Sequence, residues 1–157
     1  MKKNLAMINI HNINYKIKDR VIFNNANLHL KNNCINFIIG ENGVGKTTLI
    51  NELIKYFMVN KIYLNNTLIK NNAIFYQSSE RTFLPRIKGG EYLEFRDKLL
   101  LTDNHKNYTF YEKLFNLNLK NYINEYSTGM KRKIEFIPSL FKKYSVYIFD
   151  EPFNGLD

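Results

Sequence analysis

The chain has 157 residues, of which 45% are hydrophobic and 24% charged, enough for one globular domain with a real core. Its formal net charge is +9, but the lysines are scattered as on a solvated surface, so we expect no nucleic acid partner. The lone cysteine, Cys34, excludes an internal disulfide. It lies in the apolar run 34–39, so we expect it to be a small buried residue. A chain with a single cysteine fits the cytosol, where disulfides are rare.

No apolar stretch of the sequence approaches the ~20 residues that cross a bilayer. The basic pair Lys2-Lys3 is not followed by a long apolar segment, so we expect no signal peptide. We therefore expect any membrane association to come through a partner.

The first part of the chain has the patterning of short β-strands. Apolar residues recur within 6–10, 21–23 and 28–30, which predicts an antiparallel sheet at one edge of the fold. The run Ile35–Ile39 is short, rich in β-branched residues and ends at Gly40, so it predicts a buried strand.

An amphipathic helix is predicted from about Gly45, because apolar residues then recur at helical spacing on one face. These residues are Leu49, Ile50, Leu53, Ile54 and Phe57. A hairpin is predicted between 61–64 and 67–69, with Asn65-Asn66 as its turn. The run Ala73–Tyr76 predicts another short strand.

Residues 78–143 read as a helical subdomain inserted between strands. Helices are predicted at Glu91–Leu101 and Tyr108–Leu119, and the polar residues 102–107 join them. A further helix is predicted from about Gly129 to Lys143.

Pro138 lies inside this last helix and should kink it or remove a backbone hydrogen bond. Val146–Phe149 follows as a predicted buried strand that ends in Asp150-Glu151. Strands alternating with helices around a helical insert indicate an α/β fold with a mostly parallel central sheet and an antiparallel N-terminal edge sheet. We expect a single domain over 1–157.

The most specific motif is Gly40–Thr47, which matches the phosphate-binding pattern G-x-x-x-x-G-K-[ST] between a predicted strand and a predicted helix. A glycine-rich turn points successive backbone N–H groups at phosphates, and the following helix adds its positive N-terminal dipole. In this pattern Lys46 reaches the β- and γ-phosphates of ATP, and the Thr47 hydroxyl binds Mg²⁺. The residues expected to contact the nucleotide here are Gly40, Glu41, Asn42, Gly43, Val44, Gly45, Lys46, Thr47 and Thr48.

Two acids follow the last predicted strand. Asp150 is placed to hold Mg²⁺, directly or through water, and Glu151 to orient or deprotonate the water that attacks the γ-phosphate. Paired acids after a strand also occur in ordinary turns, but the phosphate-binding loop favours the catalytic interpretation.

Together these motifs resemble the nucleotide-binding cassette of ABC transporters, over essentially the whole chain and in the family's order. The resemblance makes 40–47 the Walker A loop and Tyr147–Asp150 Walker B, with Glu151 as the catalytic glutamate. It implies that Gln77 contacts Mg²⁺ and the attacking water, and that Tyr15 stacks on adenine, although Tyr15 also suits strand packing. Residues 155–157 match the D-loop.

The signature motif is Ser127–Lys131, reading STGMK, and it distinguishes ABC proteins from other P-loop NTPases. In the family, Ser127 and the N–H of Gly129 face the γ-phosphate bound by a second cassette, so two cassettes close around two ATP molecules. The string 126–132 looks most like bacterial exporters of the ABC-2 type. The resemblance therefore implies a transport ATPase subunit beside the inner face of the membrane, with a transmembrane permease and a second cassette as partners.

The sequence departs from the family at its end. A full cassette continues beyond the D-loop to a switch histidine. The three histidines here, His11, His29 and His105, all precede the D-loop, so none matches that residue by position. Two expectations stay open: a fragment of a longer cassette, truncated after the D-loop, or a natural short form that binds ATP and hydrolyses it poorly.

Other functions remain as alternatives, namely a regulatory or degenerate cassette, or a soluble ABC protein acting on ribosomes or nucleic acid. For a transporter subunit, the surface around 83–85 and 92–95 is the expected permease dock. Internal packing of the helical subdomain is an equally good interpretation of those residues.

Overall fold

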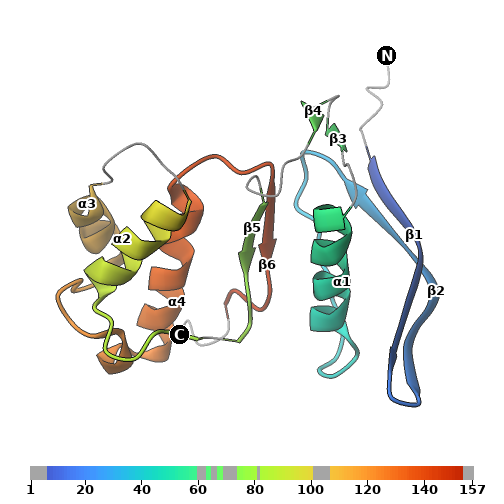
Figure 1. Cartoon of the computed structure of the whole chain (residues 1–157), viewed down its shortest axis with the longest axis horizontal. Coiled ribbons are helices and arrows are strands. Elements are labelled where there is room, and N and C mark those ends of the chain that lie inside the picture. Colours follow the sequence, from blue (N-terminus) through green and yellow to red (C-terminus); the bar gives the residue numbers. More distant parts are fainter. Residues whose placement is uncertain are drawn as a thin grey trace. The chain divides into compact units, whose positions relative to one another are not determined.

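The computed structural model describes residues 7–59, 63–64, 67–68, 74–80, 82–100 and 107–153. These residues belong to two compact units, Met1–Asn71 and Asn72–Asp157. Figure 1 labels their helices and strands.

The N-terminal unit begins with a long antiparallel hairpin. Strand β1 spans Met7–Ile17 and pairs with β2, Arg20–Lys31, from Met7 opposite Lys31 to Ile17 opposite Arg20. This confirms the predicted antiparallel sheet, but as two long strands and not several short ones.

Asparagines shape the hairpin at the places where its register shifts. Asn12 and Asn25 have φ values of 58° and 55°, in the left-handed region that asparagine tolerates better than most residues. The side chain of Asn27 accepts a hydrogen bond from the Asn12 amide, and that of Asn14 accepts one from the Asn25 amide. Asparagine side chains thus satisfy backbone groups that the irregular ladder leaves without a cross-strand partner.

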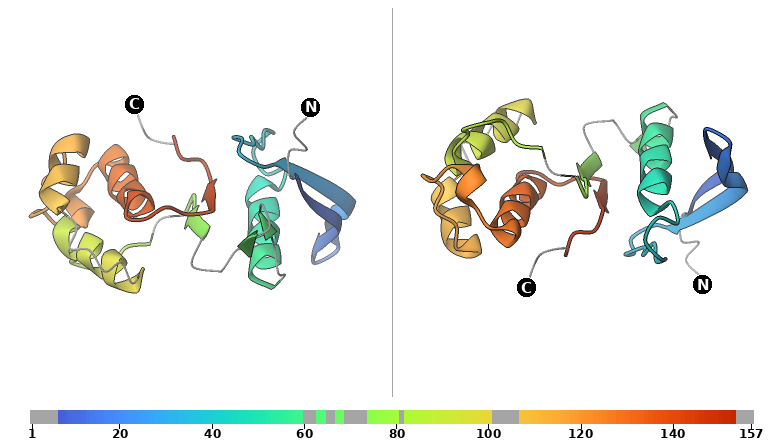
Figure 2. Two further views of the ribbon diagram at one scale, coloured as in Figure 1. Left: turned by 90° about the horizontal axis from the view of Figure 1, so that it is seen from above. Right: turned by 90° about the horizontal axis from the view of Figure 1, so that it is seen from below.

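Helix α1, Lys46–Val59, confirms the helix predicted after the phosphate-binding motif. Within this unit it lies alongside the β1–β2 hairpin (Figures 1 and 2). Of the predicted apolar face, four residues are buried: Ile50, Leu53, Ile54 and Phe57. The short strands β3, Tyr63–Leu64, and β4, Thr67–Leu68, pair antiparallel as the predicted hairpin requires; its Asn65-Asn66 turn lies outside the described residues.

The prediction of a buried strand at Ile35–Ile39 is wrong in this structure. The segment is irregular, and Ile35, Phe37 and Ile39 are 82%, 76% and 91% exposed. Cys34 is exposed too, against the expectation of a buried thiol. Asn36 provides a local reason, because its amide group bonds both the N–H and the carbonyl of Lys31, a side-chain alternative to a strand ladder.

The C-terminal unit is built on a parallel strand pair. Strand β5 spans Ile74–Gln77 and β6 spans Val146–Phe149, in register from Ile74 opposite Val146 to Gln77 opposite Phe149. Both strands were predicted, but Gln77 is the last residue of β5 and does not follow it. Strand β6 is only partly buried, since Tyr147 is exposed.

Three helices pack together in this unit (Figure 2): α2, Gly89–Leu99; α3, Tyr108–Phe115; and α4, Thr128–Phe136. Two 3₁₀ helices accompany them, η2 at Ile123–Glu125 and η3 at Ile137–Leu140. Their shared core consists of Leu93, Tyr111, Leu117, Leu119, Ile123, Tyr126, Ile134, Ile137 and Phe141.

Two helices end earlier than predicted. Asn116 caps α3 in a left-handed conformation at φ 50°, and this cap stops the predicted helix at Phe115 instead of Leu119. Helix α4 ends at Phe136 and does not continue to Lys143. Pro138 stands in the first turn of η3, so the α-helix gives way to a 3₁₀ helix at the proline, which has no N–H group to donate an α-helical hydrogen bond.

Leu93→Ala should lower the free energy of unfolding of the C-terminal unit by about 2–5 kcal/mol, because the fully buried side chain would leave a cavity. Urea unfolding followed by circular dichroism measures this loss. Leu99→Ala, in the same helix but 61% exposed, is the matched control and should change stability by less than about 0.5 kcal/mol. Equal losses would contradict the described helical core.

Candidate functional site

The phosphate-binding loop lies in the N-terminal unit, directly before α1. The Lys46 ammonium turns back across the loop and donates hydrogen bonds to the carbonyls of Gly40 and Glu41, both at 2.8 Å. The amide of Leu49 donates to the Gly45 carbonyl at 2.8 Å and closes the first turn of α1. The loop is therefore tied into a ring whose cation stands at the start of a helix, the arrangement that suits a polyphosphate.

Glycine is required at two points of this loop. Gly43 has φ +77° and Gly45 has φ +105°, conformations that an L residue adopts only at a cost. A Cβ atom on Gly45 would stand 2.9 Å from Ile22 Cγ2 and 3.3 Å from Phe23 Cζ, whereas one on Gly43 would meet nothing within 4 Å. The loop thus packs closely on strand β2.

Thr47 and Thr48 occupy the first turn of α1, half-buried, at the helix end that favours anions. Glu41, Asn42 and Val44 are exposed on the loop. This exposure leaves the loop open toward solvent.

Tyr15 lies on β1, opposite Phe23 of β2, the strand on which Gly45 packs. The Lys55 ammonium stands 5.7 Å from the centre of the Tyr15 ring, so the ring already has a cation on one face. Stacking of Tyr15 on a base stays a prediction.

A polar pair lies at the carboxyl ends of β5 and β6. Gln77 and Asp150 are both buried, and the Asp150 amide donates to the Gln77 carbonyl at 2.9 Å. The Gln77 Oε1 atom has no hydrogen-bond partner, and an orphaned buried oxygen of this kind suits a ligand. Gln77 thus offers an amide oxygen and Asp150 a carboxylate, and both are oxygen ligands of the kind that a hard cation such as Mg²⁺ takes.

Glu151 follows on the surface, with φ 49°. The left-handed conformation costs a non-glycine residue about 1–2 kcal/mol. This turn separates the exposed Glu151 from the buried Asp150. The matched D-loop, 155–157, lies outside the described residues.

The signature motif begins α4. Ser127 is the N-cap, and its Oγ accepts a hydrogen bond from the Met130 amide at 3.2 Å. Gly129 lies in the first turn, where helix amides have no intrahelical acceptor. The motif is therefore a helix N-terminus with a serine hydroxyl beside it, as the predicted anion site requires.

Tyr126 anchors the residue before this N-cap. Its buried hydroxyl donates to the Asn118 carbonyl at 2.7 Å. Burial, together with the nearby Glu112 carboxylate, raises the pKa of Tyr126 to about 12. The phenol therefore stays protonated as a donor throughout the physiological range.

Two residues near this site were missed by sequence reasoning. Ser79 donates its hydroxyl proton to Asp150 Oδ2 at 2.9 Å, and Arg132 of α4 binds the carbonyls of Ser78 and Ser79. Arg132 belongs to the basic run 131–133, which reads as a solvated surface in the sequence, yet it is 2% exposed. No pattern in the sequence would have marked either residue.

The structure thus places the predicted residues in two groups. Tyr15 and 40–48 belong to the N-terminal unit, whereas Gln77, Asp150, Glu151 and the signature residues Ser127 and Gly129 belong to the C-terminal unit. Within the described ranges, no cluster of three or more histidine, cysteine, aspartate or glutamate side chains offers a separate metal site.

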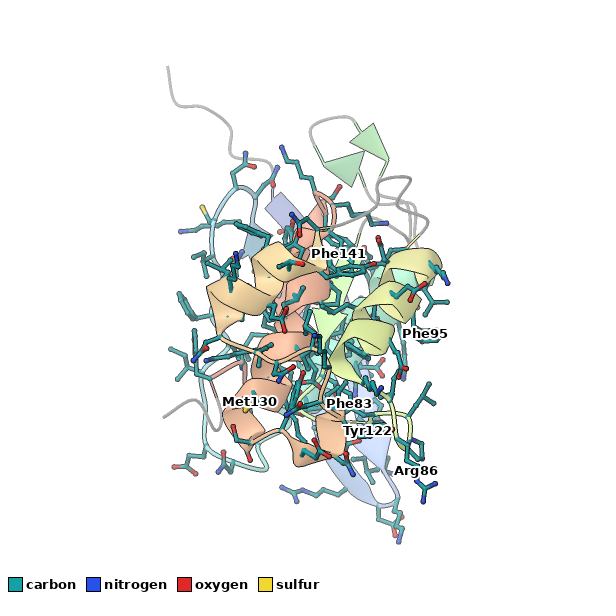
Figure 3. The ribbon with its side chains drawn as sticks, turned by 90° about the vertical axis from the view of Figure 1, so that its left-hand side faces the viewer. Phe83, Arg86, Phe95, Tyr122, Met130 and Phe141 are labelled. Carbon is teal, nitrogen blue, oxygen red and sulfur yellow. The ribbon has the colours of Figure 1, made fainter. Side chains whose placement is uncertain are left out.

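The predicted docking surface is partly internal. Phe83 and Tyr92 pack on the helical core, with ring centres 5.5 Å apart, as the alternative interpretation expected. Leu84 and Phe95 are exposed, and Figure 3 shows the face of the molecule on which Phe83 and Phe95 lie.

Gly45→Ala should destabilise the N-terminal unit more than Gly43→Ala. Both substitutions force an L residue to a positive φ at about 1–2 kcal/mol, but only Gly45→Ala drives a methyl group into Ile22. Urea unfolding of both variants gives the comparison. Identical stabilities would contradict the close packing of the loop on β2.

Tyr126→Phe should lower the free energy of unfolding by about 0.5–1.5 kcal/mol at pH 8, because the Asn118 carbonyl loses its hydrogen-bond donor. The folded pKa is raised, so the hydroxyl's contribution is complete below pH ~10 and is lost as the pH rises toward ~12. The stability gap between wild type and variant should therefore shrink across that window, as unfolding curves at several pH values would show.

The exposed Tyr122→Phe is the control for removing a tyrosine hydroxyl, and should change stability at pH 8 by less than about 0.5 kcal/mol. A gap between wild type and Tyr126→Phe that stays constant from pH 8 to pH 12 would contradict the buried donor.

In the described part of the chain, no helix has the length and apolar character to span a membrane.

Comparison with known proteins agrees with this geometry. The sequence profile of the ABC transporter family matches residues 23–154. A cytochrome c biogenesis ATP-binding export protein, CcmA of Reclinomonas americana, is 30% identical, over 96% of this chain and 72% of that protein. The probable peptide export ATP-binding protein YydI of Bacillus subtilis is 27% identical, over 96% of this chain and 69% of that protein.

The zinc import ATP-binding protein ZnuC of Buchnera aphidicola is 30% identical, over 96% of this chain and 62% of its own length. Among solved structures, a putative ABC transporter ATP-binding protein of Pyrococcus furiosus matches with a TM-score of 0.73 at 23% identity, covering 94% of this chain and 76% of that one. This likeness gives the fold, that of a P-loop NTPase. On the family match and the CcmA relative together, the chain belongs to the ABC transporter family of ATP-binding proteins.

Proposed function

We propose that this chain binds ATP with Mg²⁺, hydrolyses it, and powers a transporter as one of two cassettes. The observation that carries the proposal is the ring-shaped loop 40–48 with Lys46 across it at the start of α1, in a chain of the ABC transporter family. The sequence pattern, the loop geometry and the family match all support the same ligand class.

Binding rests on groups that the loop already presents. The Lys46 ammonium exchanges the Gly40 and Glu41 carbonyls for phosphate oxygens, and the first amides of α1 donate to them. Thr47, Gln77 and Asp150 would hold Mg²⁺, which neutralises developing phosphate charge. Tyr15 would stack on adenine.

Hydrolysis needs a base near the attacking water. Glu151, exposed next to the buried Asp150, would take a proton from water while Asp150 remains with the cation. The Gln77 Oε1 atom would accept a hydrogen bond from the same water or bind Mg²⁺.

The second cassette supplies the opposing anion site. Ser127 and the Gly129 amide, at the start of α4, would face the γ-phosphate held by the partner's loop. ATP would then lie between two cassettes, and closure on ATP would alternate with opening after hydrolysis. The structural support is the N-cap geometry at Ser127.

The membrane partner we propose is a permease at the inner face of the cell membrane, docked on the exposed side chains Leu84 and Phe95. Export is the direction we favour, from the signature string and from two relatives whose names specify export. A third relative is named for zinc import, so direction differs among proteins similar to this chain.

Lys46→Ala should weaken ATP binding by about tenfold or more, because a charge-assisted contact to the phosphates is lost. Glu151→Gln should leave ATP binding intact and slow phosphate release by about a hundredfold or more, because the general base is removed. Equilibrium binding of a fluorescent ATP analogue and a phosphate-release assay measure the two effects.

Lys113→Ala, at an exposed position of α3, is a control for the loss of a lysine outside the loop and should leave ATP binding unchanged. Failure of the wild-type chain to bind ATP would sink the proposal. Binding without turnover would favour the alternative of a regulatory cassette that does not hydrolyse.

A further inference from the structure

Arg132 is a buried cation with two specific acceptors. It projects from α4, five residues after the N-cap Ser127, and is 2% exposed. Its Nη1 donates to the Ser78 carbonyl at 2.8 Å, and its Nη2 donates to the Ser79 carbonyl at 3.3 Å. Both acceptors lie immediately after Gln77, so the guanidinium fixes the backbone of that segment to the signature helix.

Ser79 continues the connection to the other strand. Its Oγ donates to Asp150 Oδ2 at 2.9 Å, while the Asp150 amide donates to the Gln77 carbonyl. One side of the Asp150 carboxylate is thereby fixed by a residue whose own backbone is held by Arg132. The connection therefore runs from Arg132 of α4 to the Ser79 carbonyl, and from the Ser79 hydroxyl to Asp150.

The geometry suits arginine and no other basic residue. A planar guanidinium reaches two successive carbonyls at once, whereas an ammonium is a point donor on a flexible stem. Glu135, one turn along α4, stands 3.6 Å from Arg132 Nη1 and partly balances the buried charge. An apolar side chain would fill the helical core without the desolvation cost of a buried cation, so the arginine is better explained by its two hydrogen bonds to the carbonyls.

We propose that Ser79 and Arg132 are positioning residues for the magnesium ligand Asp150, and that they tie its placement to the signature helix. The Ser79 hydroxyl fixes the orientation of the Asp150 carboxylate, and Arg132 fixes the backbone of Ser79 by donating to its carbonyl. The inference rests on the proposed function, in which Asp150 holds Mg²⁺. It assigns a role to two residues outside the recognised motifs.

The test compares ATP binding in Mg²⁺ with ATP binding in EDTA, by equilibrium titration of the full protein. The dissociation constant in EDTA divided by that in Mg²⁺ measures how much Mg²⁺ strengthens ATP binding. This ratio therefore reports the Mg²⁺ site and not the phosphate loop. Ser79→Ala should lower this ratio by about tenfold, as expected for the loss of an outer-shell hydrogen bond, and leave binding in EDTA unchanged. Ser79→Thr, which keeps the hydroxyl, should restore the wild-type ratio.

Arg132→Lys extends the test to α4. Both side chains act on Asp150 through the same hydrogen bond from Ser79. The double variant Ser79→Ala with Arg132→Lys should therefore lower the ratio of dissociation constants no further than the more affected single variant does. Additive losses would overturn the shared path. Should Arg132→Lys fail to fold by circular dichroism, the Ser79→Ala and Ser79→Thr pair still decides the role of Ser79.

A wild-type chain that binds no ATP overturns the proposed function. A wild-type chain with a clear Mg²⁺ ratio, which Asp150→Ala abolishes but Ser79→Ala leaves unchanged, overturns only the positioning role. A fall in both EDTA and Mg²⁺ binding for Ser79→Ala would indicate a general structural defect and contradict the proposal.

Discussion

The parallel pairing of β5 with β6 is the constraint on which the C-terminal unit depends. Its register sets Gln77 opposite Phe149, so the next residue, Asp150, donates its amide to the Gln77 carbonyl. A shift of one residue would turn every side chain of β6 to the other face of the sheet and would break the hydrogen bond between the Asp150 amide and the Gln77 carbonyl. This register brings the backbone of Asp150 against that of Gln77, and the Ser79 hydroxyl donates to the Asp150 carboxylate beyond the ends of the two strands.

The phosphate loop obeys a different constraint, which is backbone conformation. Positive φ at Gly43 and Gly45, with the close approach of Gly45 to β2, shapes a turn that the Lys46 ammonium closes. Here the sequence was highly informative, because the glycines, the lysine and the following amphipathic helix each report the same local geometry. Helix α1 was therefore predictable from residue type and spacing, whereas for the N-terminal sheet the antiparallel strands were predictable but their length was not.

Other features depend on contacts that spacing does not encode. Ile35–Ile39 has the composition of a buried strand, but burial needs neighbouring strands, and Asn36 instead satisfies the backbone of Lys31. Helix α3 ends where Asn116 adopts a left-handed conformation. The sequence does not show whether an asparagine continues a helix or caps it. Arg132 reads as a surface cation until the fold brings two carbonyls to it. The candidate site could be located from the sequence, whereas its supporting hydrogen bonds could not.

The most direct test of ATP binding at the loop is hydrogen exchange of the full protein with and without ATP and Mg²⁺. ATP should slow the exchange of the amides in 41–48, since these N–H groups would donate hydrogen bonds to phosphate oxygens. Unchanged exchange across that segment at saturating ATP would contradict it.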